Sequence, residues 1–478
     1  MSYPRLKMLI AGEWTYGSSN IDEPVINPAD DCELGRVPHA SLKDLDDAIL
    51  SSALGFEIWK KKTAAERQEV LESAAKLLDE RFNKISINLT QEMGKPLNES
   101  RIELRLAINL LRWYAEEGKR IYGRTIPSRI PGMENEVRKN PVGPVIGFSV
   151  WNFPANNAMR KIAGALASGC SIVLKPSEET PATAIAIGKA LTDAGLPSGV
   201  LNIVFGNPPE VSAYLMKSAI PRKLSFTGSV AVGIHLQQLA AKQMIRCTLE
   251  LGGHAPAIVF DDCCVEKIAK LCVAGKFRNA GQVCISPTRF LIQENIYEDF
   301  KKAFIKETKK LKVGNGLDTT NTMGPLAAKR RVESMSIFVK DAVANGSHLI
   351  SGGEPHAGEG AFFEPTVMVD VPKTAKIMQE EPFGPLAPIS VFKDLDEVVC
   401  EANRLPFGLA AYAFTQNPKT AGVLKSEIET GMLAINSLHV HSPETPFGGV
   451  KFSGFGSEGG SEGLEEFLNI KYVSEFYP

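Results

Sequence analysis

The sequence predicts an α/β protein with parallel sheets and more than one domain. Strand-like and helical runs alternate from Val142 onward: strands at 142–150, 171–174, 201–205, 223–226 and 257–260, a helix at 156–168, and another that begins with a cap and a first-position proline at Thr180-Pro181. Such alternation is typical of a parallel sheet covered by helices, which binds ligands beyond the carboxyl ends of its strands. A length of 478 residues is too great for one core and predicts two or three domains.

Composition and charge exclude several classes of protein. An apolar content of 44% and a charged content of 23% are ordinary for a soluble globular protein. A net charge of -2 gives no general case for nucleic acid or an anionic membrane as partner. Eight cysteines in so long a chain form no disulfide framework, and none shows zinc-binding spacing, so we expect no metal. No apolar leader or membrane-length run is present, so we expect a reduced, cytoplasmic protein.

The N-terminal third is predicted to contain packing helices without chemistry. Apolar residues recur at helical spacing over 48–59, over 64–81 with Thr63 as a cap, and over 98–118. The pattern breaks between Tyr122 and Lys139, where prolines and a glycine indicate a loop.

Three polar side chains stand out against apolar surroundings. Cys284 follows a helical run at 265–277 and a polar loop that contains a glycine, a setting that would present its thiol into a cleft. A lone cysteine is more often a small, buried apolar residue. Glu250 lies between apolar strand residues and a glycine pair. Considered by itself, this carboxylate could equally lie at the exposed edge of a strand. Asn152 follows an apolar strand. A thiol, a carboxylate and an amide are the parts that thiol-mediated oxidation of an aldehyde requires.

The dinucleotide fingerprint is missing from its usual place. The G-x-G-x-x-G match at 454–459 follows no convincing strand, so we interpret it as a chance occurrence. Residues 226–229, followed by Gly233 and a helical run, are a better phosphate site, because a helix N-terminus accepts anions through its backbone N–H groups. By itself, such a strand-to-helix turn is common.

Seven motifs in one order resemble the aldehyde dehydrogenase superfamily over almost the whole chain. They are WNFP from Trp151, Val173 to Pro176, FTGS from Phe226, LELGG from Leu249, GQVC from Gly281, EEPFGP from Glu380 and PFGGVKFSG from Pro446. The resemblance implies a Rossmann-like NAD(P)-binding domain (1–118 and 140–252), a second α/β catalytic domain (253–452) and a small β oligomerisation arm (119–139 and 453–478). An open strand edge at 468–476 also predicts a homodimer or homotetramer.

The resemblance assigns catalytic roles to four residues. Cys284 would attack the aldehyde, and the amide of Asn152 with the Cys284 N–H would bind the resulting oxyanion. Glu250 would act as general base when water hydrolyses the thioester, and Lys175 would tune the local electrostatics.

The expected cofactor is NAD, with NADP also possible. A carboxylate at Glu178 would accept hydrogen bonds from the adenosine ribose and repel a 2′-phosphate, although Lys175 and Ser177 would accommodate one if Glu178 turned away. Without the resemblance, these residues would suit a solvated loop equally well. The implied cofactor-binding residues are Trp151, Lys175, Ser177, Glu178, Gly228, Ser229, Leu251, Glu381 and Phe383.

The implied substrate is a semialdehyde with a distal carboxylate. Arg160 and Arg278 would bind that carboxylate, in a pattern similar to the succinate-semialdehyde and α-ketoglutarate-semialdehyde branches, with Asn156, Asn157 and Ile285 completing the pocket. Either arginine could instead be a structural ion-pair partner, and a neutral aliphatic or sugar-derived aldehyde is the alternative substrate. His439 and His441 are interpreted as solvated loop residues.

Three other functions are weighed against this one. A dehydrogenase that transfers its thioester to CoA tends to lack the carboxylate found at Glu250, and a catalytically silent relative would lose Cys284 or Glu250. A binding role, for instance toward RNA, leaves no readable mark in the sequence.

Overall fold

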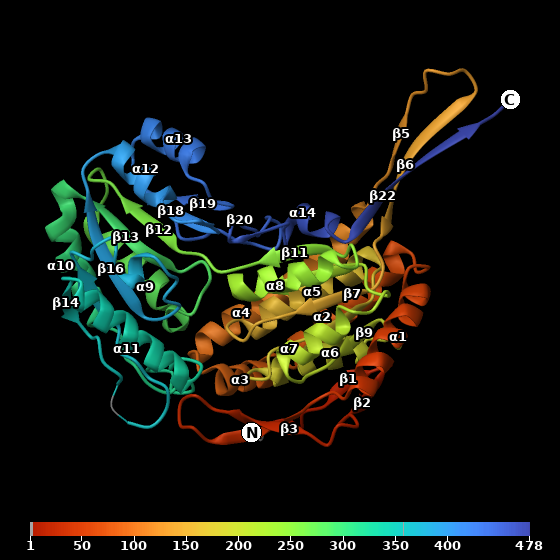
Figure 1. Cartoon of the computed structure of the whole chain (residues 1–478), viewed down its shortest axis with the longest axis horizontal. Helices are drawn as coiled ribbons and strands as arrows, with labels where there is room; N and C mark the ends of the chain where they lie inside the picture. The colour runs from red at the N-terminus through yellow and green to blue at the C-terminus, as the bar shows by residue number, and fades with distance from the viewer. Residues whose placement is uncertain (1–2, 357) are drawn as a thin grey trace.

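The computed structural model describes residues 3–356 and 358–478, which form two α/β domains and a projecting β-arm (Figure 1). One sheet has the strand order β2-β1-β9-β8-β7-β10-β11-β21, and the other has the order β14-β15-β16-β13-β12-β18-β19. The predicted α/β class is therefore confirmed.

The first sheet is parallel at its centre and antiparallel at both edges. Strands β9, β8, β7, β10 and β11 run parallel, whereas β1 and β21 pair antiparallel. The strands are β1 (Met8–Ile10), β2 (Glu13–Thr15), β7 (Val145–Phe148), β8 (Ile172–Lys175), β9 (Leu201–Ile203), β10 (Lys223–Thr227), β11 (Arg246–Glu250) and β21 (Gly454–Phe455). β7 is shorter than predicted at its start, where Gly143 has a φ of 127° and Pro144 has no N–H to donate.

Helices pack around this sheet much as the apolar spacing predicts. They are α1 (Leu42–Trp59), α2 (Ala64–Glu80), α3 (Phe82–Met93), α4 (Leu97–Glu117), α5 (Pro154–Ser168), α6 (Pro181–Asp193), α7 (Pro208–Leu215) and α8 (Val230–Ala241). The Thr63 cap of α2 is confirmed. α1 begins earlier than predicted, because Ser41 and Asp44 form a capping box ahead of the apolar repeat. The sequence analysis did not predict α3.

The predicted cap of α6 is wrong in one respect. Pro181 does occupy the first turn, but the Thr180 side chain makes no capping hydrogen bond. Instead Glu92, from α3, accepts the backbone N–H groups of Ala182 and Thr183 at 2.9 and 3.1 Å. A buried carboxylate from another helix therefore replaces the local cap, which no local pattern could reveal.

The second sheet is covered by helices on both faces. Successive residues of β12 contribute to apolar clusters on opposite faces of the sheet. Ala257 and Val259 pack with α9 and α10, whereas Ile258 packs with α12 and α13. The strands are β12 (Ala255–Val259), β13 (Pro287–Gln293), β14 (His348–Ser351), β15 (Thr366–Val369), β16 (Leu386–Phe392), β18 (Ala410–Phe414) and β19 (Met432–Ile435). The helices are α9 (Val265–Phe277), α10 (Tyr297–Thr308), α11 (Lys329–Ala344), α12 (Leu395–Asn403) and α13 (Pro418–Glu427). α9 has its predicted bounds.

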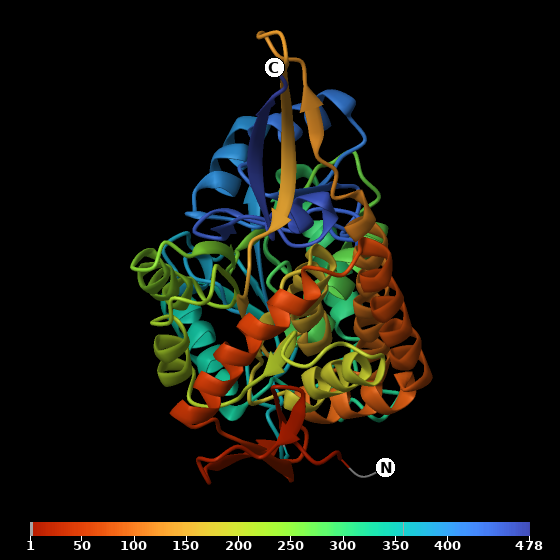
Figure 2. The ribbon, with the colours of Figure 1, turned by 90° about the vertical axis from the view of Figure 1, so that its right-hand side faces the viewer.

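The arm is an antiparallel sheet of β22 (Leu468–Phe476), β6 (Met133–Pro141) and β5 (Arg124–Ile126). It projects from the first domain, and the C-terminus lies beside it (Figure 2). For the region 122–139 the local pattern indicated a loop and the resemblance implied a β arm; the region contains β5 and most of β6. The segment 453–478 is divided: β22 lies in the arm, whereas β21 pairs with β11 and α14 (Gly460–Glu465) packs on α5.

Smaller antiparallel pairs complete the fold. They are β3 (Asp22–Ile26) with β4 (Glu33–Pro38), and β17 (Phe407–Gly408) with β20 (Val450–Lys451).

Candidate active site

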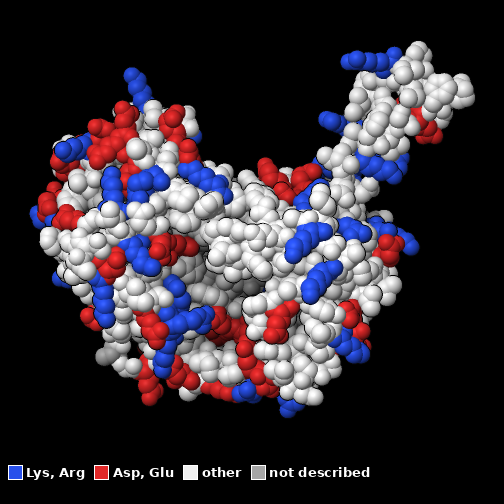
Figure 3. Space-filling model, in the orientation of Figure 1, with Lys and Arg blue, Asp and Glu red and all other residues white. Residues whose placement is uncertain are grey.

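A cavity of about 550 Å³ lies where residues of the two domains meet. The face of the molecule in Figure 3 is hollowed between the domains, with acidic and basic side chains interspersed around it. Most of the predicted site residues line this cavity: Trp151, Asn152, Asn156, Asn157, Arg160, Gly228, Ser229, Glu250, Leu251, Arg278, Cys284, Ile285, Glu381 and Phe383. Folding therefore brings together residues that are far apart in the sequence.

Cys284 follows a strained turn after α9. Asn279, Ala280 and Gly281 all have left-handed backbone conformations, with φ of 49°, 50° and 74°. A Cβ at Gly281 would lie 2.1 Å from the Gly384 carbonyl oxygen, so this position requires glycine. Strain of this kind persists only where the surrounding structure enforces it, and here it brings the nucleophile loop against the cavity.

The surroundings of Cys284 keep its thiol protonated. Burial, followed by the carboxyl groups of Glu381 and Glu250, raises the pKa of Cys284 to about 12, although Arg160 and Arg278 oppose the shift. A thiol is a weak nucleophile, so a reaction at this sulfur needs a proton acceptor.

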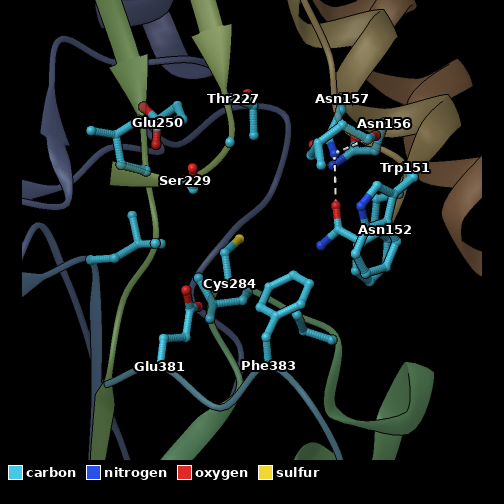
Figure 4. Close-up of a pocket in the computed structure, with 18 of the residues that line it drawn as sticks. Trp151, Asn152, Asn156, Asn157, Thr227, Ser229, Glu250, Cys284, Glu381 and Phe383 are labelled. Carbon is cyan, nitrogen blue, oxygen red and sulfur yellow. Dashed lines mark hydrogen bonds between the residues drawn. The ribbon is translucent and has the colours of Figure 1, made fainter. Parts of the chain in front are cut away.

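Asn152 lies across the cavity from Glu250, with Cys284 between them in the close-up (Figure 4). The Asn152 side-chain N–H donates to the Gln282 carbonyl at 3.0 Å, two residues before Cys284. Its Oδ1 accepts a hydrogen bond from Asn157 Nδ2 at 3.1 Å. These bonds fix which way the amide faces and leave its second proton for a ligand.

Glu250 ends β11 with its carboxylate unsatisfied. The residue is 3% exposed, and neither carboxylate oxygen has a hydrogen-bond partner among the described residues. Burial raises the pKa of Glu250 well above its usual value, Glu458 raises it further, and Arg160 and Lys161 lower it. A buried carboxyl with a raised pKa is suited to accepting and releasing a proton near neutral pH.

The turn between β10 and α8 has the form of a phosphate site. A Cβ at Gly228 would meet the Phe226 ring at 2.3 Å, and one at Gly233 would meet Leu251 at 2.5 Å, so glycine allows the helix to lie close to the sheet. Ser229 occupies the N-cap position without a side-chain capping bond. Its hydroxyl and the first N–H groups of α8 are thus available to an anion.

Glu381 and Phe383 form the opposite wall. Phe383 packs edge-on against Trp151 with ring centroids 5.5 Å apart, and its carbonyl accepts from Arg331 at 3.0 Å. Glu381 accepts the Gly253 N–H at 3.3 Å, and burial raises its pKa to about 8. Together with the turn between β10 and α8, this wall fits a dinucleotide that enters between the domains.

Lys175, Ser177 and Glu178 are not part of this cavity lining. The Lys175 ammonium donates to Glu178 at 2.6 Å, and the second Glu178 oxygen accepts the Gly206 N–H at 2.9 Å. The charge of Lys175 is thus paired with that of Glu178, and the role of Lys175 in tuning the nucleophile stays a prediction. Its place beyond β8 suits a cofactor contact.

Two guanidinium groups enter the cavity without a carboxylate partner. Arg160 is 4% exposed, lies 4.2 Å above the Phe447 ring and donates only to the Glu458 carbonyl, at 3.3 Å. Arg278 lies 5.5 Å above the Phe153 ring. In the described part of the chain, no carboxylate oxygen is within 4.0 Å of either group. The alternative of structural ion pairs is therefore not observed.

Comparison with known proteins decides the family. The profile of the aldehyde dehydrogenase family matches residues 14–473. The chain belongs to the aldehyde dehydrogenase family. It is an NAD(P)-dependent aldehyde dehydrogenase.

Relatives of this dehydrogenase differ in their substrates. A putative 4-(hydroxymethyl)benzenesulfonate dehydrogenase of Comamonas testosteroni is 45% identical over 98% of this chain and 97% of its own. The succinate-semialdehyde dehydrogenase [NADP(+)] of Escherichia coli is 40% identical over 98% and 97%. A crystal structure of succinate-semialdehyde dehydrogenase from Burkholderia pseudomallei has a TM-score of 0.97 at 39% identity, covering 99% of this chain and 98% of that one.

His441 corrects the expectation of two solvated histidines. His439 is exposed, but His441 lines the cavity, and its buried Nδ1 has no hydrogen-bond partner among the described residues. Burial, followed by Arg160 and Arg278, lowers the pKa of His441 to about 3. The dehydrogenase therefore presents a neutral imidazole beside two cations.

Other residues that line the cavity of the dehydrogenase were not predicted from the sequence, because neither their residue types nor their spacing by themselves indicate a role in catalysis or binding. They are Val150, Phe153, Thr227, Gly252, Val283, Arg330, Arg331, Leu409, Phe447 and Glu458. Several lie within or beside the quoted motifs, which was the available hint.

Two features are absent from the described part of the dehydrogenase, a membrane-spanning helix and a metal-binding cluster. Among residues 3–356 and 358–478, no helix has the length and apolar character needed to cross a membrane. The same residues contain no cluster of His, Cys, Asp and Glu suited to a metal.

Proposed function

We propose that this dehydrogenase oxidises an aldehyde whose far end carries an anion, foremost a carboxylate as in succinate or α-ketoglutarate semialdehyde. The observation that supports this is the pair Arg160 and Arg278, which lie unpaired in the same cavity as Cys284. Arg160 is buried and Arg278 half-buried, and among the described residues no carboxylate oxygen lies within 4.0 Å of either guanidinium group. Desolvated cations without a close partner are costly, and a bound anion would relieve that cost. A tail held by the guanidinium groups would direct the aldehyde toward the sulfur.

The proposed chemistry begins at the sulfur. Cys284 releases its proton to solvent water and its thiolate attacks the aldehyde carbon, forming a thiohemiacetal whose oxyanion accepts hydrogen bonds from the Asn152 amide and the Cys284 N–H. Bound nicotinamide supplies the acceptor for the hydride that leaves this carbon. The product on the protein is then a thioester of Cys284.

Glu250 completes the cycle in this proposal. Its free carboxylate takes a proton from water, the resulting hydroxide attacks the thioester, and the acid leaves as Cys284 regains a proton. The unsatisfied oxygens of Glu250 support this role, because a carboxylate already bound to donors would be a poorer base.

We further propose NAD as the preferred acceptor. Both oxygens of Glu178 are held, by Lys175 and by the Gly206 N–H, so the carboxylate does not turn aside without losing two hydrogen bonds. A fixed negative charge there would repel a 2′-phosphate.

A sulfonate is a second candidate for the distal anion. Two relatives at 45% identity are both named for 4-(hydroxymethyl)benzenesulfonate, and His441 offers a neutral donor beside the arginines. Three donors suit the three oxygens of a sulfonate, and the Phe153 and Phe447 rings suit an aromatic body.

Replacing each arginine tests the anion proposal. Breaking a desolvated bidentate arginine–carboxylate contact costs roughly 2–4 kcal/mol, so Arg160→Leu or Arg278→Leu should lower kcat/KM for succinate semialdehyde about 30- to 1000-fold. Oxidation of propanal, which has no anion, should barely change. An equal fall for both substrates would mean that the arginines hold the fold.

The unaltered enzyme identifies the anion. We would rank kcat/KM for succinate semialdehyde, α-ketoglutarate semialdehyde, 4-formylbenzenesulfonate and propanal. If kcat/KM is highest for the sulfonate, a sulfonate and not a carboxylate is the distal anion. If it is highest for propanal, the proposal of a distal anion is wrong.

Assembly and compartment are also proposals. The arm exposes apolar side chains along β22, whose outer edge is open, so we propose that it pairs with another subunit in a homodimer or homotetramer. All eight cysteines are free thiols, which suits a reducing compartment such as the cytoplasm.

A further inference from the structure

Three charged residues surround the start of α4, a helix to which the sequence analysis gave no chemistry. Lys95 and Glu103 are 1% and 2% exposed, and they form an ion pair of 2.6 Å. Glu99 is partly buried on the turn between them. We call Lys95, Glu99 and Glu103 the α4 cluster.

One side of the α4 cluster holds the turn that carries Asn152. Lys95 Nζ donates to the Asn152 carbonyl at 2.7 Å. Glu103 Oε1 accepts the backbone N–H groups of Ala155 and Asn156, at 2.8 and 3.3 Å, where α5 begins. The turn is thereby fixed at both ends by one buried ion pair, and a carboxylate is favoured at a helix N-terminus.

The other side of the α4 cluster holds the nucleophile loop. Glu99 Oε2 accepts the Asn279 N–H at 2.8 Å, at the first of the left-handed residues before Cys284. Asn279 Nδ2 in turn donates to the Asn152 carbonyl at 3.0 Å and to the Gln282 carbonyl at 3.2 Å. The Asn152 carbonyl therefore accepts from Lys95 and from the nucleophile loop at once.

The geometry points to the α4 cluster as a positioning device that sets the Asn152 amide against the Cys284 sulfur across the domain boundary. This inference rests on the proposed roles of Asn152 and Cys284. The two residues belong to different domains, so their separation depends on whatever ties the two loops together. The two loops also bond directly to each other, through Asn152 Nδ2 and Asn279 Nδ2. Lys95, just before α4, and Glu99, in its first turn, add a contact to each loop from one rigid element and so hold both loops to a common frame.

Fold stability alone is a weak explanation for the α4 cluster. A buried ion pair contributes little net stability compared with apolar side chains of similar volume. Phe153 also lies between Lys95, 3.8 Å from its ring, and Arg278, 5.5 Å from it. The cluster thus contacts both the turn that carries Asn152 and the loop that leads to Cys284.

Glu99 is the residue to change, because it alone reaches from α4 to the nucleophile loop. Glu99→Leu removes the acceptor for the Asn279 N–H, whereas Glu99→Gln keeps an acceptor oxygen. The matched control is Glu401→Gln, a buried carboxylate in the catalytic domain that pairs with Arg289, Arg404 and Lys373 away from the cavity.

With propanal as substrate, Glu99→Leu should lower kcat about 10- to 100-fold, as misplacing reacting groups does. Its NADH affinity should stay within about twofold of the unaltered enzyme, and Glu99→Gln should recover most of kcat. The rate at which iodoacetamide alkylates Cys284 should also change in Glu99→Leu. Glu401→Gln should lower Tm and leave kcat unchanged.

The inference would be overturned if Glu99→Leu kept its kcat and showed only a lower Tm. It would also be overturned if kcat fell as far in Glu99→Gln as in Glu99→Leu. If Glu99→Leu does not fold, the double variant Lys95→Met, Glu103→Gln tests the inference instead. In this variant the side-chain amide oxygen that replaces the Glu103 carboxylate can still accept the N–H groups at the start of α5, but the Lys95 ammonium that donates to the Asn152 carbonyl is lost. Loss of kcat there supports the inference, and full kcat overturns it.

Propanal separates this inference from the proposal about the substrate anion. It carries no anion, so its oxidation depends on the α4 cluster and not on how Arg160 and Arg278 bind a tail. Failure of the anion proposal would leave the propanal results unaffected.

Discussion

The Cys284 thiol and the Glu250 carboxyl share an environment that favours their protonated forms. Burial and neighbouring carboxylates raise the pKa of Cys284 to about 12 and that of Glu250 well above its usual value. Each group acts in its deprotonated form, as nucleophile or as base. Raised pKa values therefore move the onset of activity toward alkaline pH.

We expect kcat/KM for propanal to rise between about pH 7 and pH 9. Because a group well below its pKa gains about one factor of ten in its deprotonated form per pH unit, the rise should approach that slope. The measurement is initial NADH formation at constant ionic strength, with Cys284→Ala as a blank. A profile that is flat or falls over this range would show that the thiol is already ionised.

Glu250→Gln should separate the two halves of the reaction. Without a base for water, the thioester would hydrolyse slowly, so a burst of NADH equal to the enzyme concentration should precede a steady rate lowered about 100-fold or more. Rapid mixing with absorbance detection measures both phases. Loss of the burst would place Glu250 in the activation of Cys284, and an unchanged steady rate would remove it from catalysis.

At the scale of elements, the connection from β8 to α6 carries the expected cofactor preference. Glu178 is held there by Lys175 and by Gly206, which lies just after β9. The carboxylate thus has one orientation in the fold.

Glu178→Gln should lower the ratio of kcat/KM for NAD to kcat/KM for NADP by about tenfold. This corresponds to the loss of ~1.4 kcal/mol of repulsion between the carboxylate and the 2′-phosphate. The ratio of kcat/KM values for the two cofactors measures it. Ser177→Ala, which leaves the charge in place, is the control. Equal kcat/KM for NAD and NADP in the unaltered enzyme would contradict the premise.

At the scale of the whole molecule, the arm leaves β22 with an open edge. Ile470 and Tyr472 are 73% and 59% exposed and lie on one face of the strand, whereas Lys471 lies on the other. Exposed apolar residues beside an unpaired edge favour pairing with a second chain.

Ile470→Lys combined with Tyr472→Lys should therefore lower the molar mass in solution, because charge on this face opposes burial against another subunit. Light scattering after size-exclusion chromatography measures the mass, and Lys471→Ala is the control on the opposite face. A monomeric unaltered enzyme, or a double variant of unchanged mass, would contradict a role for this face.

The sequence by itself determined the α/β class, the helices α2, α4 and α9, the strand β22 and the family. Periodicity and motif order suffice for these, because each is a local pattern repeated along the chain. It did not reveal α3, whose apolar face has no separate local signal, and only the family resemblance, not the local pattern, implied that 119–139 belongs to a β arm.

Only the tertiary structure decided what each side chain faces. Arg160 and Arg278 are far apart in the sequence, yet they share a cavity, with no ion-pair partner among the residues that the structure describes, and His441 enters it from a loop that looked solvated. Lys175 forms an ion pair with Glu178. Partners of this kind are set by long-range contacts between strands and helices, so no local pattern in the chain records them.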